Sequence, residues 1–155
     1  MTDHVSKIPE GYPGATPYLV IRGAADAIDF YKKVFGAEEL LRLSSPDGSV
    51  GHAELRIANG VVMLADEVPE MEIKAPPTIG GSSVGLMLYV EDPDAVFDAA
   101  VAAGATQFKP MCDQFYGERS GTLDDPFGHR WTIACRVENV DHEEIKKRFE
   151  ELYGD

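Results

Sequence analysis

The strongest constraint on the fold of this chain is an internal repeat with an offset of 68 residues. The Asn59-Gly60 turn of one hydrophobic hairpin is matched by Asp125-Pro126-Phe127-Gly128 in a later hairpin. The same offset relates two further pairs of dipeptides without a gap: Gly36-Ala37 with Gly104-Ala105, and Asp26-Ala27 with Asp94-Ala95. A repeat of this length is one supersecondary unit used twice. We therefore expect two copies of the same small module.

The first copy predicts a βαβββ module over about residues 16–66. Residues 16–22 are rich in β-branched and aromatic side chains, which favours a strand. Apolar residues then recur at helical spacing up to Gly36, a residue type that commonly ends helices. Residues 39–44 and the two arms of the Asn59-Gly60 hairpin add three more strands.

The second copy predicts the same order of elements over about residues 84–136. Asp92 is placed to cap the helix of this module, with Pro93 at its first position. Between the copies, residues 67–83 are rich in proline and glycine and predict an exposed linker. A linker of this length acts either as a lid over a site or as a plain tether.

After the repeats, Asp141 and Glu144 form a capping-box pattern that predicts a final helix over about residues 141–153. Together the elements predict an α+β fold in one domain, residues 1–155. Its two tandem βαβββ modules are expected to form a curved mixed sheet with a cleft, followed by the C-terminal helix.

Charge and hydropathy restrict the partners of this chain. The formal net charge is −13, which repels nucleic-acid phosphates and anionic membrane surfaces. No apolar run approaches the ~18 residues of a membrane span, and the polar start has no signal-peptide core. We therefore expect a cytoplasmic protein whose partners are a small molecule and a second copy of itself, with no nucleic acid and no membrane.

One predicted strand carries the residues best suited to proton transfer. Between residues 50 and 57 the side chains alternate, so that Ala53, Leu55 and Ile57 share one face and His52, Glu54 and Arg56 share the other. The apolar set is expected to face the helices. His52 and Glu54 then form a candidate acid–base pair, or hold a metal in an unusual place, or belong to a salt-bridged solvated face. The repeat places Ser120, Thr122 and Asp124 at the matching positions.

A second candidate region is the loop before the late hairpin. Gln114, Phe115, Tyr116 and Arg119 bring an aromatic pair next to an amide and a guanidinium, which suits an amphipathic or carboxylate-bearing ligand. The alternative is that the aromatic pair packs against another subunit. Tyr18, Arg56 and Thr132 complete the predicted ligand-binding set. Trp131 is predicted to lie in the core, and His129 is predicted to be a turn or surface histidine.

The motifs AIDFY (residues 27–31), GHAE (51–54), FYGER (115–119) and DPFGH (125–129) resemble the vicinal oxygen chelate superfamily, and in particular its PhnB-like glyoxalase branch. This group contains glyoxalase I, bleomycin-resistance proteins and extradiol dioxygenases. The resemblance covers residues 18–136. It implies paired βαβββ modules, a small-molecule cleft and a homodimer.

The resemblance also identifies where a metal would be held. In metal-dependent members the ligands come from the first and last strands of each module, and these positions fall at Thr16, Leu64, Val84 or Gly85, and Thr132. None is a ligand that Zn²⁺, Ni²⁺ or Fe²⁺ prefers. The sequence therefore predicts no metal and no cofactor, which disfavours dioxygenase activity.

Two functions are compatible with this pattern. The first is a glyoxalase/bleomycin-resistance-like protein that binds a small molecule in the cleft between its modules without a metal. The alternative is a lyase, isomerase or transferase of the same superfamily that uses His52 and Glu54 as an acid–base pair.

Overall fold

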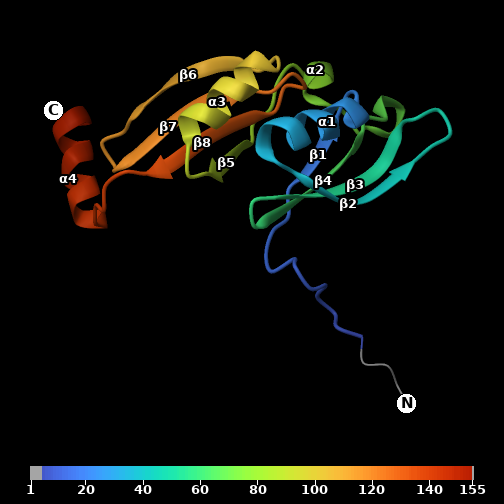
Figure 1. Cartoon of the computed structure of the whole chain (residues 1–155), viewed down its shortest axis with the longest axis horizontal. Helices are drawn as coiled ribbons and strands as arrows, with labels where there is room; N and C mark the ends of the chain where they lie inside the picture. Colours follow the sequence, from blue (N-terminus) through green and yellow to red (C-terminus); the bar gives the residue numbers. More distant parts are fainter. Residues whose placement is uncertain (1–4, 155) are drawn as a thin grey trace. The chain divides into compact units, whose positions relative to one another are not determined.

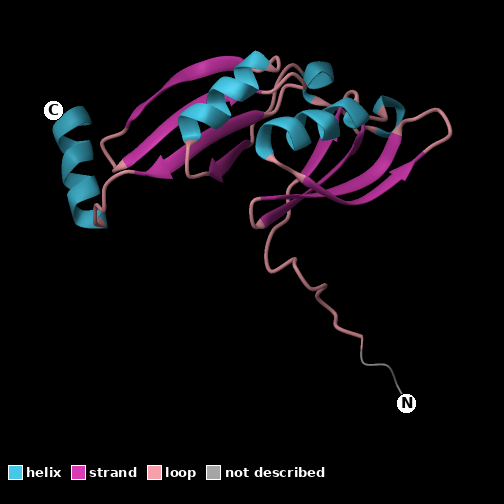
Figure 2. Ribbon diagram, in the orientation of Figure 1, coloured by secondary structure: helices cyan, strands magenta, loops and turns pink. Residues whose placement is uncertain are grey.

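The computed structural model describes residues 5–154, so the first four residues of the polar start lie outside it. The chain divides into two compact units between Thr78 and Ile79, inside the predicted linker. We call them unit 1 and unit 2. Each contains a four-stranded sheet with a helix packed on one face (Figures 1 and 2). The predicted α+β fold with two tandem modules is confirmed.

Unit 1 has the predicted order of elements. Its bounds are β1 (Tyr18–Ile21), α1 (Ala24–Phe35), β2 (Glu38–Ser44), β3 (Val50–Ile57) and β4 (Gly60–Asp66). The strands lie in the order β1-β4-β3-β2. β1 runs parallel to β4, and the other pairs are antiparallel.

Unit 2 repeats this arrangement and adds a last helix. Its bounds are β5 (Gly85–Tyr89), α3 (Pro93–Ala102), β6 (Thr106–Asp113), β7 (Glu118–Asp124), β8 (Arg130–Arg136) and α4 (His142–Tyr153). The strand order is β5-β8-β7-β6, with β5 parallel to β8. The strands of the two modules thus form two hydrogen-bonded sheets, one in each unit.

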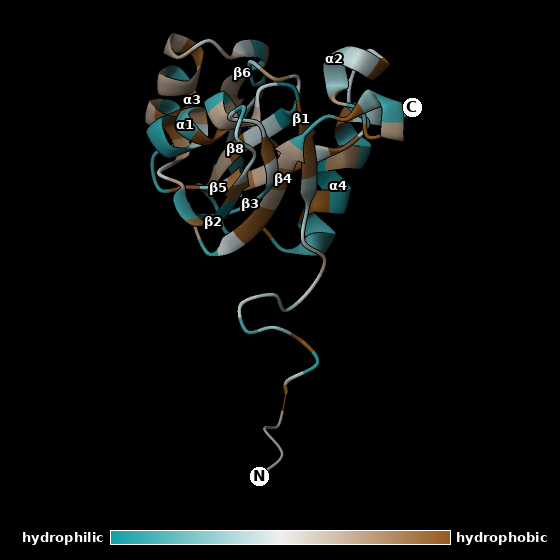
Figure 3. Cartoon of the chain, turned by 90° about the vertical axis from the view of Figure 1, so that its right-hand side faces the viewer, coloured by the Kyte–Doolittle hydropathy of each residue, from teal (hydrophilic) through white to brown (hydrophobic). Residues whose placement is uncertain are grey.

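The alternation predicted for β3 is confirmed and defines the core of unit 1. Ala53 and Leu55 are fully buried, together with Ile28 and Tyr31 of α1. His52 and Glu54 lie on the opposite face and are half-buried. Such alternation is visible along the strands in Figure 3, where brown hydrophobic and teal hydrophilic segments occur on one ribbon. The face of the sheet away from α1 is called the open face below.

The first helix begins at Ala24, where a distant carboxylate caps it. Asp66, at the end of β4, accepts hydrogen bonds from the backbone N–H groups of Gly23 (3.0 Å) and Ala24 (2.8 Å). Its other oxygen accepts from Val50 N–H at 2.7 Å. One side chain therefore satisfies free N–H groups of the helix and ties β4 to the start of β3.

The turn between β7 and β8 is built around a buried aspartate. Asp125 Oδ1 accepts from the N–H groups of Phe127 (2.9 Å) and His129 (3.0 Å), and Oδ2 accepts from the indole of Trp131 (3.0 Å). Gly128 has φ 91, the left-handed conformation that the turn requires. Trp131 is buried as predicted, and His129 follows the turn glycine as predicted but is buried and does not lie on the surface. The turn packs against Trp131 because Asp125 accepts hydrogen bonds from both the turn backbone and the indole.

The stretch predicted as an exposed linker, residues 67–83, contains local structure. A short 3₁₀ helix (η1, Pro69–Met71) and a one-turn helix (α2, Pro76–Ile79) form within it, and Val68 pairs with Ile73. Glu67 fixes this segment by accepting from Arg22 (2.8 Å), Ala75 N–H (3.0 Å) and Thr78 (2.6 Å). The periodicity of the sequence gave no sign of this fold, because a single side chain organises it.

The C-terminal helix α4 has the predicted N-cap, since Asp141 accepts from Glu144 N–H at 2.8 Å. Arg148 pairs with Glu138 at 2.8 Å and donates to the carbonyl of Phe115 at 3.0 Å. No described residue of α4 is fully buried. Among the helices within residues 5–154, none combines the length and the apolar character needed to cross a membrane.

Candidate functional site

The open face of unit 1 carries a continuous row of hydrogen-bonded polar side chains. Tyr18 Oη lies 2.8 Å from His52 Nδ1, and His52 Nε2 lies 3.2 Å from Glu54 Oε1. The hydroxyl of Tyr12 donates to the other oxygen of Glu54. We refer to these four residues as the polar row. The structure thus brings together the predicted pair, His52 and Glu54, with the predicted ligand residue Tyr18.

Backbone register explains this assembly. Tyr18 of β1 and Glu54 of β3 both pair with Met63 of β4, so they lie on the same face two strands apart. His52 precedes Glu54 by two residues and therefore shares that face. Its ring lies 5.5 Å from the ring of Tyr18.

Tyr12 is the member of the row that sequence reasoning missed. It belongs to the proline- and glycine-rich arm before β1, where no periodicity assigns a face. Its hydrogen bond with Glu54 lowers the pKa of the Glu54 carboxyl, and the bond from His52 lowers it further. The same contact raises the pKa of the Tyr12 hydroxyl. Glu54 is thereby held as a carboxylate.

A pocket of about 490 Å³ adjoins the row at Tyr18. Its apolar wall is formed by residues of β1, the start of β3, β4 and the segment after β4. They are Val20, Val50, Ala65, Val68 and Ile73. Its polar edge contains Tyr18, two serines, and Asp66 with Glu67. The contacts described above occupy both carboxylates: Asp66 binds backbone N–H groups, and Glu67 binds Arg22 and Thr78.

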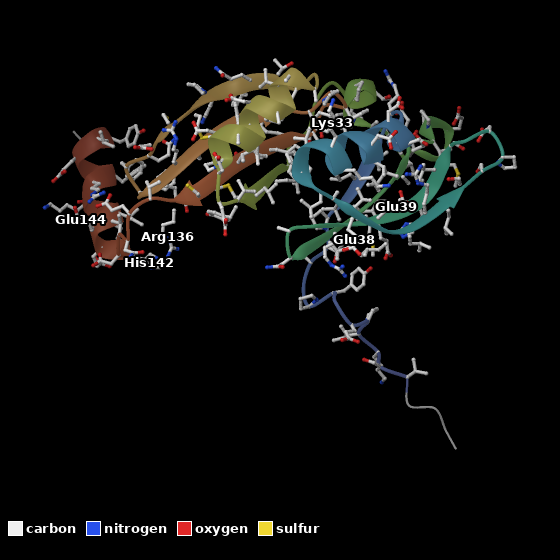
Figure 4. The ribbon with its side chains drawn as sticks, viewed as in Figure 1. Lys33, Glu38, Glu39, Arg136, His142 and Glu144 are labelled. Atoms are coloured by element: carbon white, nitrogen blue, oxygen red, sulfur yellow. The ribbon has the colours of Figure 1, made fainter. Side chains whose placement is uncertain are left out.

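The remaining predicted residue of unit 1, Arg56, lies at the other end of β3. It pairs with Glu38 at 2.8 Å, and both side chains are largely exposed. Figure 4 labels Glu38 together with its neighbour Glu39 at the start of β2. Arg56 is not among the described residues that line the pocket.

The predicted aromatic loop of unit 2 packs against the C-terminal helix. The ring of Phe115 lies 5.1 Å from Tyr116, 6.0 Å from Phe149 and 6.4 Å from Tyr153. Gln114 donates to the sulfur of Cys112 at 3.3 Å. The sequence left open whether this aromatic pair contacts a ligand or a second subunit. In the structure, Phe115 packs against α4 of its own unit.

The other two predicted residues of unit 2 lie in its strands, Arg119 in β7 and Thr132 in β8. Arg119 forms a two-pronged ion pair with Asp94 of α3, with both bonds at 2.7 Å, and also pairs with Asp113 at 3.2 Å. These carboxylates raise the pKa of its guanidinium. Thr132, in the middle of β8, shares a 2.9 Å hydrogen bond with Thr122 on the open face of the second sheet.

The match to known proteins agrees with this duplicated architecture. Residues 4–133 match the Glyoxalase/Bleomycin resistance protein/Dioxygenase superfamily. The chain belongs to this superfamily. Protein Mb0911c of Mycobacterium bovis is 45% identical over 137 residues, covering 86% of this chain and 90% of that protein.

Solved structures of the superfamily share the fold. TioX from Micromonospora sp. ML1 superposes with a TM-score of 0.62 at 26% identity, covering 83% of this chain and 99% of TioX. The PhnB protein from Bacillus cereus gives a TM-score of 0.62 at 22% identity, covering 78% and 98%. The predicted resemblance to the PhnB-like branch is therefore confirmed at the level of fold.

The side chains at the superfamily's predicted metal positions do not fit a transition metal. Leu64 is fully buried on the α1 side, and Thr132 offers a hydroxyl that is bonded to Thr122. Within residues 5–154, no three His, Cys, Asp or Glu side chains gather in a way that could hold an ion. Alkyl and hydroxyl groups are poor ligands for Zn²⁺, Ni²⁺ and Fe²⁺. No step of the chemistry below is routed through a metal.

One detail of the repeat alignment needs correction here. Two residues separate the paired Ile57 and Gly60 in unit 1, whereas five separate Asp124 and Arg130 in unit 2. The two turns therefore differ by three residues. Because side chains alternate along a strand, this odd difference means that residues of β4 and β8 related by the offset of 68 point to opposite faces of their sheets. Met63, not Leu64, therefore shares the open face with Glu54.

Proposed function

We propose that this superfamily member is a small-molecule-binding protein whose site is the open face of unit 1. The observation that carries the proposal is the pocket of about 490 Å³ that meets the polar row at Tyr18. Binding sites for small molecules typically combine a mainly apolar wall with a few placed polar groups, in volumes of roughly 300–1,000 Å³. The predicted position of a ligand between the two modules stays a prediction.

The arrangement suits binding for two reasons. The apolar wall can bury the body of a ligand, which is stabilising by roughly 25 cal/mol for each Å² removed from water. The polar row is held by its own hydrogen bonds, so its donors and acceptors need little reordering when a ligand arrives. The bleomycin-resistance members of the superfamily provide the precedent of a binding role.

A pocket-filling variant tests the proposal. Val20→Trp places an indole in the pocket, while Val101→Trp adds the same group on the outer surface of α3. We expect a library of apolar amines, alcohols and ketones, screened by thermal shift, to yield ligands for the wild type and for Val101→Trp. The same ligands should lose their shift with Val20→Trp. A ligand at 100 times its dissociation constant adds about 2.7 kcal/mol. Unchanged shifts with Val20→Trp would place the site elsewhere.

A second function, acid–base catalysis as a lyase, isomerase or transferase, is favoured by the bonds around His52. Both of its ring nitrogens are hydrogen-bonded, one to Tyr18 and the other to Glu54. A proton exchanged with a substrate would therefore pass through the Tyr18 hydroxyl, with Glu54 orienting the imidazole. His52→Ala separates the two functions. A binder loses modest affinity, whereas an enzyme loses turnover by orders of magnitude.

We further propose a homodimer in the cytoplasm. Membership of the superfamily supports the dimer, and β5 of unit 2 exposes Met87 and Tyr89 on a free strand surface. Light scattering coupled to size exclusion tests it at micromolar concentration. A strict monomer would remove the dimer and leave the site of unit 1 as proposed.

A further inference from the structure

The hydrogen bonds of the polar row have a direction, and that direction determines what Tyr18 can offer to a ligand. An ionised carboxylate only accepts hydrogen bonds. Glu54 accepts from the Tyr12 hydroxyl at one oxygen, so the partner of its other oxygen must also donate. That partner is His52 Nε2, which therefore carries a proton.

The direction continues to the far end of the row. In a neutral imidazole only one nitrogen carries a proton, and the other accepts. When His52 is neutral and its proton is on Nε2, its Nδ1 atom accepts, and the Tyr18 hydroxyl 2.8 Å away donates its only proton to it. The lone pairs of Tyr18 Oη are then the free hydrogen-bonding positions. At the edge of the pocket, Tyr18 is an acceptor.

The charges in the rest of the pocket lining also favour a ligand that donates hydrogen bonds. Neither lysine nor arginine occurs among the described residues that line the pocket. Its two carboxylates, Asp66 and Glu67, have the partners named above, but they keep the local potential negative. A chain with a net charge of −13 adds to that potential. Both charged side chains in the described lining are carboxylates, so an anionic ligand would meet like charge from the lining itself.

We propose that Tyr18 Oη accepts a hydrogen bond from the ligand, which is therefore an apolar molecule bearing an N–H donor such as a primary amine. The inference rests on the proposed binding function and adds the ligand class. Tyr18 is the specificity-determining residue. His52, Glu54 and Tyr12 are positioning residues that act by fixing the direction in which the Tyr18 proton points.

The test compares three probes with one aromatic body. 1-Naphthylmethylamine carries a charge and N–H donors, its N,N,N-trimethyl analogue carries the same charge without a donor, and 1-acetonaphthone has only an acceptor. Calorimetry should give the primary amine about tenfold tighter binding than the trimethyl analogue, the effect of one hydrogen bond. The ketone should bind more weakly than the amine.

Two tyrosines provide the matched control. Tyr18 and Tyr89 are 50% and 55% exposed, and each lies on the first strand of its unit. Tyr18→Phe should reduce the preference for the primary amine to about one, and Tyr89→Phe should leave it at about tenfold. Equal binding of the amine and its trimethyl analogue by the wild type would overturn the donor inference while the binding function stands. Binding of none of the three probes would overturn both.

A spectroscopic measurement tests the direction of the row without any ligand. A long-range ¹H–¹⁵N spectrum shows which ring nitrogen of His52 carries the proton, with the signal assigned from His52→Asn. We expect the proton on Nε2 in the wild type. Glu54→Gln should weaken this preference, because an amide can donate as well as accept. A proton on Nδ1 in the wild type would overturn the inference, since Tyr18 would then receive a hydrogen bond.

Discussion

Units 1 and 2 share strand order, helix position and hairpin topology, yet their open faces differ in chemistry. Unit 1 presents His52 and Glu54 joined to two tyrosines. At the repeat-related positions unit 2 presents Ser120 and Thr122, both buried, with neutral hydroxyls. The core of a module constrains only the residues that face its helix. The open face is free to diverge, and unit 2 carries neutral hydroxyls at the two positions that match His52 and Glu54.

The two units also differ in how an aspartate secures the hairpin. In unit 1, Asp66 binds backbone N–H groups of α1 and β3. In unit 2, Asp125 stays within its own turn and binds Trp131. The starts of α1 and β3 therefore depend on the Asp66 carboxylate in unit 1, whereas the turn between β7 and β8 depends on the Asp125 carboxylate in unit 2. The predictions below test these differences, beginning with the largest.

Replacing the turn aspartate should have the largest effect. Asp125→Ala leaves two backbone N–H groups and the Trp131 indole without their acceptor in a buried turn. We expect a loss of about 3 kcal/mol in the free energy of unfolding, measured by urea denaturation. Asp98→Ala removes the same charge from the exposed side of α3 and should change stability by less than about 0.5 kcal/mol. Similar losses in both variants would show that net charge, not the turn, is responsible.

Two strand glycines give the next contrast, one in each unit. A Cβ on Gly121 of β7 would lie 2.9 Å from the Phe97 ring and 3.1 Å from the Met111 backbone, whereas one on Gly51 of β3 would meet only a carbonyl at 3.6 Å. Gly121→Ala should therefore destabilise the protein by about 2 kcal/mol, as overpacking does. Gly51→Ala should be nearly neutral by the same denaturation assay. A neutral Gly121→Ala would mean that α3 packs less closely on its sheet than α1 does.

The sequence was sufficient to predict the fold because its signals are local and repeated. Each signal specifies a short stretch of chain: the hydrophobic periodicity, Asp92 as an N-cap, and the turn glycines. The repeat provides a second copy of the module in which the same order of elements is predicted. The start of α1 could not be predicted, since its cap comes from Asp66, 42 residues away. The fold of residues 67–78 depends on Glu67, which binds Ala75 and Thr78 within the segment and Arg22, 45 residues away.

The candidate site was predictable only in part, for a related reason. Strand alternation placed His52 and Glu54 on the open face, where they lie. It could not reveal Tyr12, which reaches the site from an arm without periodicity. For the loop from Gln114 the sequence left a ligand and a second subunit open, and it did not indicate α4, because an aromatic pair has the same sequence signature in all three contacts.

A pH titration should show a smaller effect confined to unit 1. The hydrogen bonds to Glu67 lower the pKa of its carboxyl from 4.5 to about 2, with Thr78, the Ala75 N–H and Arg22 as causes. The unfolded chain therefore takes up this proton first, and the stabilisation, fully present above pH 4.5, is lost as pH falls toward 2. Glu67→Gln should flatten this part of the stability curve, while the exposed Glu150→Gln should not. If the stability of Glu67→Gln depended on pH as steeply as that of the wild type, the Glu67 carboxylate would not be what stabilises the segment after β4.

The smallest effect is expected at Arg119, and it tests whether unit 2 takes part in binding. Its guanidinium is bonded to Asp94 and Asp113 on a partly exposed surface, where ion pairs contribute about 0–1 kcal/mol. Arg119→Gln should thus cost less than about 1 kcal/mol in stability. Because a ligand would have to break the two-pronged pair to reach Arg119, the affinity for 1-naphthylmethylamine should change less than about twofold. A tenfold loss of affinity would support the sequence prediction that Arg119 binds ligand, and would extend the site beyond unit 1.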